Sequence, residues 1–171
     1  MPRNVIDKYF DWSNDLIKED LKKNSFPFAI CMSHIEGDFN IGTVLRSANA
    51  FGCEKMFYFG QKKYDPRGSV GTKNYTLIQY LESFEQLLEL KNEYTFVGLE
   101  ISDRAIMLSE FQWPAKSLLI VGEELRGLSK EILDICDHII QIKQYGSVRS
   151  LNVGVAASVA MYDFHSKNNS L

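Results

Sequence analysis

The stretch "SLLIVGEELRGLSKEILDIC", residues 117–136, joins a short apolar run to a glycine-containing turn and then to a helical pattern. The run at residues 117–121 shows no polar alternation, which is typical of a strand buried on both faces. After the turn, apolar residues recur at helical spacing. A buried strand followed by a turn and a helix indicates a unit of an α/β fold.

Similar units occur along the rest of the chain. Apolar runs predict further buried strands at residues 27–32, 55–59, 94–99 and 138–142. Helical patterns lie at residues 40–51, 83–92, 128–136 and 153–164. We therefore expect an α/β fold in which a mostly parallel sheet is flanked by helices and joined by right-handed crossovers.

The chain has 171 residues, of which 45% are hydrophobic and 24% charged, and this composition predicts one globular domain. An amphipathic pattern at residues 1–24 predicts an N-terminal helical lead before a domain at residues 25–171. We expect a cytoplasmic protein, because no signal-peptide core or bilayer-spanning apolar run occurs. The net charge of −3 gives no general attraction to nucleic acid, so an RNA partner requires a local basic patch.

The cysteines Cys31, Cys53 and Cys136 are widely spaced and lie in apolar surroundings. Such residues are more often buried free thiols than disulfides or metal ligands. The histidines add no ligand spacing, so we expect no metal site.

Polar residues gather in three turns that follow predicted strands. These turns cover residues 37–52, 122–129 and 145–153, and each combines glycine with polar or charged residues. Ligands of parallel sheets bind at the carboxyl ends of the strands, so the turns form the candidate site. The chain contains neither the GxGxxG pattern of dinucleotide-binding folds nor the P-loop pattern.

Taken singly, the polar residues of these turns have structural explanations. Helix capping would explain Asn40, Ser150 and Asn152. Glu124 could face the dipole of the following helix, and Arg46 could be a solvated helical residue. Arg46 also lies one turn beyond Gly42, whose missing side chain would leave room for a ligand.

Taken together and in this order, the three turns resemble the signature of the SpoU/TrmH family of RNA ribose 2′-O-methyltransferases. The family pattern NxGxxxRxAxxFG is present as "NIGTVLRSANAFG" at residues 40–52, and GxExxGL as "GEELRGL" at residues 122–128. The third motif, with its SLNV core, is present as "YGSVRSLNV" at residues 145–153. The chain departs from the family just before this motif, where Ile142, Lys143 and Gln144 replace Ile-Pro-Met.

The resemblance implies a C-terminal trefoil knot, a homodimer and S-adenosylmethionine as cofactor. It places the cofactor at Gly122, Glu123, Leu128, Ile142 and Leu151. The polar positions that it links to catalysis are Asn40, Arg46, Glu124, Ser150 and Asn152. In the family the arginine reaches the cofactor site of the opposite subunit. The apolar surface of the last helix is expected at the dimer interface, with Val155, Val159 and Tyr162 as candidates.

The resemblance implies methyl transfer to a ribose 2′-hydroxyl of structured RNA. The leading substrate is tRNA at a D-loop guanosine, and rRNA is the alternative. Arg46 would hold the ribose phosphate with its planar fork, and the resemblance also implies it as the proton acceptor. Because arginine is almost always charged, this second role would need an unusual environment or help from the RNA phosphate. A knotted homologue that binds RNA without modifying it, and a small-molecule enzyme at the sheet edge, stay open as other functions.

The segment at residues 60–75 is the candidate RNA surface. Its basic residues are Lys62, Lys63, Arg67 and Lys73. Tyr64 and Tyr75 lie among them, and such a combination can bind phosphates and stack bases. A solvated loop with incidental charges is the alternative.

Overall fold

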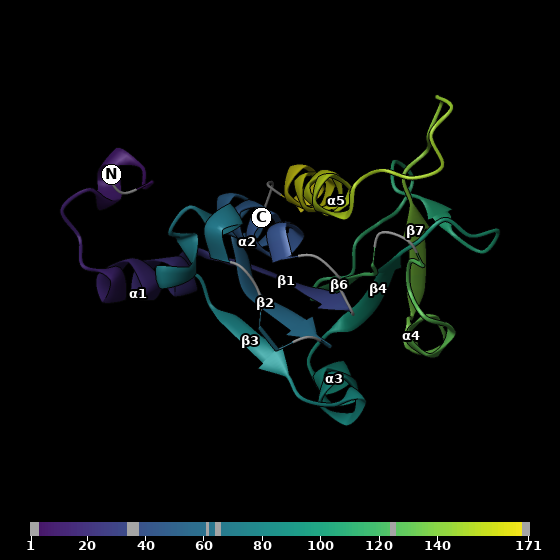
Figure 1. The fold of residues 1–171 in the computed structure, drawn as a ribbon, viewed down its shortest axis with the longest axis horizontal. Coiled ribbons are helices and arrows are strands. Elements are labelled where there is room, and N and C mark those ends of the chain that lie inside the picture. The colour runs from purple at the N-terminus through teal and green to yellow at the C-terminus, as the bar shows by residue number, and fades with distance from the viewer. Residues whose placement is uncertain (1–3, 34–37, 61, 64–65, 124–125, 169–171) are drawn as a thin grey trace.

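The computed structural model describes residues 4–33, 38–60, 62–63, 66–123 and 126–168. Its centre is a seven-stranded sheet with helices on both faces (Figure 1). The described strands all pair in parallel, in the order β3-β2-β1-β6-β4-β7-β5. They are β1 (Phe26–Ser33), β2 (Cys53–Phe59), β3 (Ile78–Leu81), β4 (Thr95–Leu99), β5 (Ile106–Met107), β6 (Ser117–Val121) and β7 (His138–Gln141). The predicted parallel sheet is confirmed.

The helices also follow the predicted pattern. They are α1 (Asn14–Asn24), α2 (Asp38–Ala50), α3 (Phe84–Glu89), α4 (Lys130–Ile135) and α5 (Val153–Asn168). Short 3-10 turns are η1 (Asp7–Tyr9), η2 (Pro66–Ser69), η3 (Thr72–Asn74) and η4 (Leu90–Asn92). Helix α2 begins at Asp38 rather than Asn40, and α5 continues to Asn168 rather than ending at Phe164.

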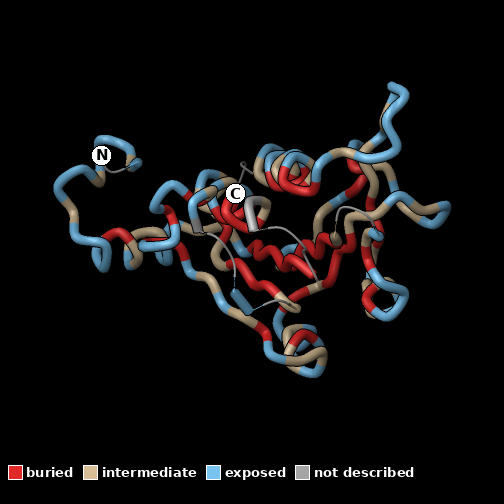
Figure 2. Tube along the Cα trace, viewed as in Figure 1, coloured by how far each residue is buried: buried red, intermediate tan, exposed pale blue. Residues whose placement is uncertain are grey.

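The sheet separates two hydrophobic cores. On one face Phe28, Ile30 and Met32 of β1 pack with α2 and α5, and on the other face Ala29 and Cys31 pack with α3 and α4. The central strands are buried along most of their length (Figure 2). Because helices cover both faces, these strands show no alternation of polar and apolar residues.

Helix α2 packs closely between η2 and α5. A Cβ atom on Gly42 would lie 2.7 Å from the Cα atom of Gly68 in η2. A Cβ atom on Gly154 of α5 would lie 3.1 Å from the Cγ2 atom of Thr43. The prediction that Gly42 leaves room for a ligand is therefore wrong, because the η2 backbone fills this space.

Helix α1 lies within the predicted N-terminal lead. The Ser13 hydroxyl caps it by accepting a hydrogen bond of 3.3 Å from the Leu16 amide. Asp20 accepts hydrogen bonds of 2.6 Å from both Lys8 and Tyr9, and the bond from Lys8 lowers the pKa of Asp20. These contacts tie η1 to α1.

The cysteines are free thiols, as predicted. Cys31 and Cys53 are buried, whereas Cys136 is half-buried. Burial raises the pKa of Cys31 and of Cys136 to about 12. In the part of the chain that the structure describes, no group of three His, Cys or acidic side chains could hold a metal ion. None of the described helices is both long enough and apolar enough to cross a membrane.

Candidate active site

A cavity of about 300 Å³ lies at the carboxyl ends of the neighbouring strands β6, β4 and β7. The segments at these strand ends line it, at residues 121–123 and 126–127, 99–101, 141–142, 144 and 149–151. Val153 and Ala156 of α5 complete the lining. A parallel sheet brings the ends of its strands to one edge, so turns far apart in the sequence meet here.

Several of the predicted site residues line this cavity, namely Gly122, Glu123, Ile142, Ser150 and Leu151. Leu128 does not, because its side chain is buried in the core on the α4 side of the sheet. Among the described residues, Asn40, Arg46 and Asn152 also lie outside the lining. Glu124 is outside the residues that the structure describes.

The turn after β6 folds back on itself. The Gly127 amide donates a hydrogen bond of 3.0 Å to the Glu123 carbonyl, and Gly127 has a φ of 67°. A Cβ atom on Gly122 would lie 2.2 Å from the carbonyl carbon and oxygen of Gly127 and 2.5 Å from the Leu128 nitrogen. Only glycine fits at position 122, because the returning backbone occupies the space of a side chain.

Glu100, which follows β4, braces the same turn. Its Oε2 atom accepts a hydrogen bond of 2.7 Å from the Leu128 amide, and its Oε1 atom accepts one of 2.9 Å from the Ile101 amide. A Cβ atom on Gly127 would lie 2.0 Å from Oε2. Glu100 was not predicted as a site residue, because no glycine follows it in the sequence. Its place directly after a predicted strand was a usable signal.

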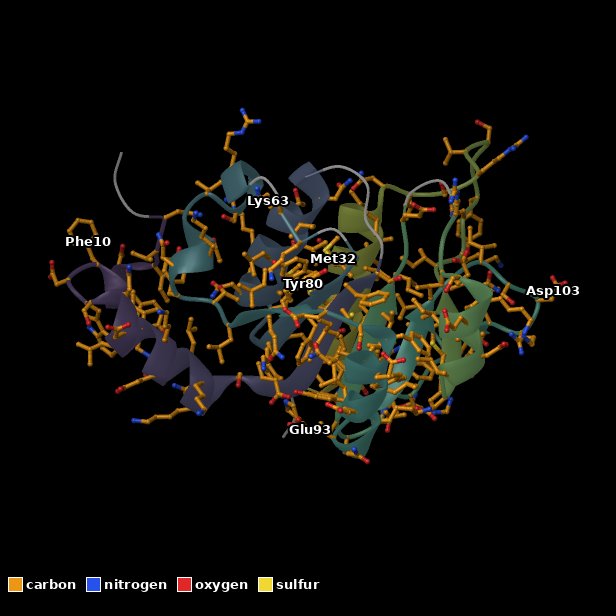
Figure 3. The ribbon with its side chains drawn as sticks, turned by 60° about the horizontal axis from the view of Figure 1, so that its bottom comes forward. Phe10, Met32, Lys63, Tyr80, Glu93 and Asp103 are labelled. Atoms are coloured by element: carbon orange, nitrogen blue, oxygen red, sulfur yellow. The ribbon has the colours of Figure 1, made fainter. Side chains whose placement is uncertain are left out.

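Replacing Glu100 by alanine is expected to lower the melting temperature. The Leu128 amide would lose its acceptor, which costs about 1–3 kcal/mol for a buried group. Each kcal/mol corresponds to about 2–4 °C in a chain of this size. The control is Asp103→Ala, since Asp103 is an exposed acid at the outer tip of the loop after β4 (Figure 3). Equal melting temperatures for the two variants would show that Glu100 does not brace the turn.

Asn40 and Asn152 join the first and third motifs. The Nδ2 atom of Asn152 donates a hydrogen bond of 3.1 Å to the Oδ1 atom of Asn40. The Oδ1 atom of Asn152 accepts bonds of 2.9 Å from the Gly154 amide and 3.3 Å from the Val155 amide, so Asn152 caps α5 as predicted. Asn40 was predicted as a cap, but α2 begins at Asp38 and places Asn40 inside the first turn.

Arg46 lies on an exposed ridge of α2. Gly42 and Asn49 face the segment at residues 66–76, whereas Thr43 and Ser47 face α5. Arg46 follows Gly42 by four residues and Thr43 by three, which places it between these two rows. Its side chain is exposed. The guanidinium can therefore reach groups beyond the surface of this chain.

The described part of the candidate RNA surface at residues 60–75 packs beside this ridge, because its turn η2 contacts the start of α2 at Gly42. Its predicted RNA-binding residues are all exposed, namely Lys62, Lys63, Arg67 and Lys73. Tyr75 is only 6% exposed, and its hydroxyl donates a hydrogen bond of 2.8 Å to the Asn4 carbonyl. The prediction that Tyr75 stacks on bases is therefore wrong, and Tyr64 lies outside the described residues.

A cavity at the strand ends of a parallel sheet, lined by the segments that follow β4, β6 and β7, defines an α/β enzyme site. Residues 27–162 match the sequence model of the SpoU rRNA Methylase family, and the chain belongs to this family. The resemblance that the three motifs indicated is confirmed.

Relatives and solved structures agree with the family. A tRNA (guanosine(18)-2′-O)-methyltransferase of Aquifex aeolicus is 28% identical over 153 residues, covering 86% of this chain and 72% of that protein. The crystal structure of the A. aeolicus TrmH/SpoU tRNA modifying enzyme matches with a TM-score of 0.82 and 25% identity, over 92% of this chain and 83% of that one. The SpoU methyltransferase AviRb of Streptomyces viridochromogenes, in complex with AdoMet, matches with a TM-score of 0.75 and 25% identity. The match covers 83% of this chain and 58% of that one.

Proposed function

We propose that this protein transfers the methyl group of S-adenosylmethionine to a ribose 2′-hydroxyl of tRNA, with a D-loop guanosine as the leading target. The cavity formed by the turns after β4, β6 and β7 carries this proposal. The Aquifex relative is named for the same reaction on guanosine 18 of tRNA, and AviRb is described with AdoMet bound.

The residues of the cavity fit this cofactor. A volume of about 300 Å³ is in the range of small-molecule sites. Apolar side chains of Leu99, Ile142 and Leu151 suit a purine ring, and Glu123 and Arg149 offer opposite charges to the zwitterionic amino-acid end. When bound, S-adenosylmethionine supplies a methyl group on a positively charged sulfur. The cavity residues orient this group and exclude water.

Arg46 is the residue of this chain that would hold the RNA. Its planar fork binds two phosphate oxygens at once, which fixes the ribose in one orientation. Methyl transfer leaves the cofactor as neutral S-adenosylhomocysteine and releases the hydroxyl proton. Because a guanidinium normally keeps its own proton, Arg46 would accept this proton only with help from the RNA phosphate that it holds. The candidate RNA surface at residues 60–75 adds positive charges that can bind neighbouring phosphates.

The functional unit is a homodimer that forms through α2 and α5. An apolar groove runs between these helices, lined by Thr43, Gly154, Val155, Ser158, Val159 and Tyr162. Val155 is 50% and Tyr162 is 59% exposed, and a second copy would cover both. Arg46 lies beside this face and lines no part of its own cavity, so it would serve the cavity of the partner subunit.

Replacing Val159 by glutamate is expected to separate the subunits and abolish turnover, because a charge would enter an apolar interface. Sedimentation measures the association and RNA methylation measures the activity. The control is Leu88→Glu on α3, because Leu88 is 37% exposed and Val159 is 39% exposed. A Val159→Glu variant that stays dimeric, or an active monomer, would contradict this interface.

The C-terminal part of the chain would thread into a knot. Strand β6 inserts between β1 and β4, and β7 inserts between β4 and β5. The loops that follow both strands line the cavity. The knot is proposed from the family resemblance, which places the cofactor in these loops.

The substrate is tested by incubating the protein with labelled S-adenosylmethionine and separated tRNA and rRNA fractions. We expect label in tRNA. Label confined to rRNA would show that rRNA, and not tRNA, is the substrate. Tight RNA binding without label would identify a non-catalytic homologue, and label on small molecules alone would identify another class of methyltransferase.

A further inference from the structure

Tyr145 is an exposed aromatic side chain beside the mouth of the cavity. Gln144 and Arg149 both line the cavity, so the chain leaves the lining after residue 144 and returns to it at residue 149. The segment between β7 and α5 projects from the body of the molecule (Figure 1). Tyr145 is 86% exposed and does not line the cavity itself. Its ring is therefore accessible to a molecule that approaches the cavity from outside.

The place of this ring distinguishes it from the other exposed aromatic residues. In the described ranges, the exposed phenylalanine, tyrosine and tryptophan side chains are Phe10, Tyr145 and Tyr162. Phe10 belongs to the N-terminal lead, and Tyr162 lies on the face of α5 that we assign to the dimer interface. Tyr145 directly follows a residue of the cavity lining. It belongs to neither hydrophobic core, so its ring is available to a ligand.

A positive charge lies over one face of this ring. The Nζ atom of Lys143 is 5.1 Å from the ring centroid of Tyr145, which is a cation–π contact. Lys143 stands where the family pattern has proline, a residue that could not make this contact. The segment at residues 143–152 contains two basic residues, Lys143 and Arg149, and no acidic residue. An aromatic face next to positive charge suits RNA, because bases stack and phosphates are negative.

The part of the RNA that reaches Tyr145 follows from the covalent structure of a nucleotide. The base is bonded to the C1′ atom of the ribose, and the neighbouring carbon carries the 2′-hydroxyl. A ribose whose 2′-oxygen faces the cavity therefore holds its base close to the mouth of the cavity. Because every base has a π face, the open face of the Tyr145 ring offers this base a stacking partner.

We infer that Tyr145 stacks on the base of the nucleotide that is methylated, with Lys143 on the opposite face of the ring. The stack fixes the ribose at the mouth of the cavity. The inference rests on the proposed function, because it requires RNA as the substrate. It assigns the base of the target nucleotide to a different side chain from Arg46, which holds the phosphate.

The test compares two RNA substrates that differ only in this base. One is a tRNA with the intact nucleotide at the position that the wild-type protein methylates, and the other has hydrogen in place of the base on the same ribose. The wild-type protein is expected to methylate the intact RNA with a kcat/KM about 5-fold to 150-fold higher, as one stacked base allows. Tyr145→Leu keeps an apolar side chain without a ring, so its kcat/KM values for the two RNAs should agree within about twofold. Tyr145→Trp should restore the preference for the intact RNA.

Val148→Ala is the matched control, because Val148 is 63% exposed in the same segment and has no ring to stack. It should keep the wild-type preference. Calorimetry with S-adenosylhomocysteine should give Tyr145→Leu the affinity of the wild-type protein, since the side chain lies outside the cavity lining.

Equal kcat/KM values of the wild-type protein for the two RNAs would overturn the inference, whether or not the variants fold. A Tyr145→Leu variant that keeps the full preference would overturn it as well. Sedimentation of Tyr145→Leu as a monomer would place the ring in a subunit interface instead of against a base. Failure of the wild-type protein to methylate any RNA would refute the proposed function, and the inference with it.

Discussion

Arg46→Lys is expected to lower turnover on RNA by about 100-fold, because a lysine keeps the charge but cannot fix a phosphate through two parallel hydrogen bonds. The affinity for S-adenosylmethionine should hardly change, since Arg46 does not line the cavity among the described residues. The melting temperature should also stay unchanged, because the Arg46 side chain is exposed. Turnover, cofactor affinity and melting temperature are measured on one preparation.

The control for this variant is Arg104→Lys, an exposed arginine in the loop after β4. It should leave turnover unchanged. Near-normal turnover in Arg46→Lys would remove Arg46 from the mechanism. Loss of activity in proportion to loss of folded dimer would show that the arginine has a structural role.

Gly122→Ala is expected to weaken cofactor binding by about 5-fold to 150-fold. The new methyl group would lie 2.2 Å from the backbone of Gly127, and Glu100 fixes the next residue by accepting a hydrogen bond from the Leu128 amide. Such overpacking costs about 1–3 kcal/mol, which corresponds to this range of affinity. Calorimetry with S-adenosylhomocysteine measures the effect, and the melting temperature should fall as well.

Gly146→Ala provides the comparison, because a Cβ atom at Gly146 would meet nothing within 4 Å. This variant should bind the cofactor as the wild-type protein does. Equal binding by Gly122→Ala and Gly146→Ala would mean that the turn after β6 moves without cost, and that its shape does not form the cavity.

The buried strands were predictable because their physical signal is local. In β1, Phe28, Ile30 and Met32 enter one core while Ala29 and Cys31 enter the other, which leaves an unbroken apolar run. The edge strands β3 and β5 gave no such signal. Strand β3 contains the exposed Gln79, and β5 has only two residues.

The site was predictable only in part, because its assembly depends on contacts between distant segments. The rule that ligands bind at strand ends identified the turns at residues 122–129 and 145–153. No pattern of spacing shows that β6 inserts between β1 and β4, or that Asn40 meets Asn152 across 112 residues. Gly42 was misread for the same reason, since the η2 backbone that fills its space comes from another segment.

The central claim is that methyl transfer occurs at a ribose 2′-oxygen, and alkaline hydrolysis of the modified RNA tests it most directly. Alkali cleaves RNA through attack of the 2′-oxygen on the adjacent phosphate, so a 2′-O-methyl group blocks cleavage at that nucleotide. After reaction with labelled S-adenosylmethionine, we expect the label in an alkali-resistant dinucleotide from tRNA. Arg46→Lys should reduce its yield. Label released as a single methylated nucleotide would place the methyl group on a base and contradict the proposed reaction.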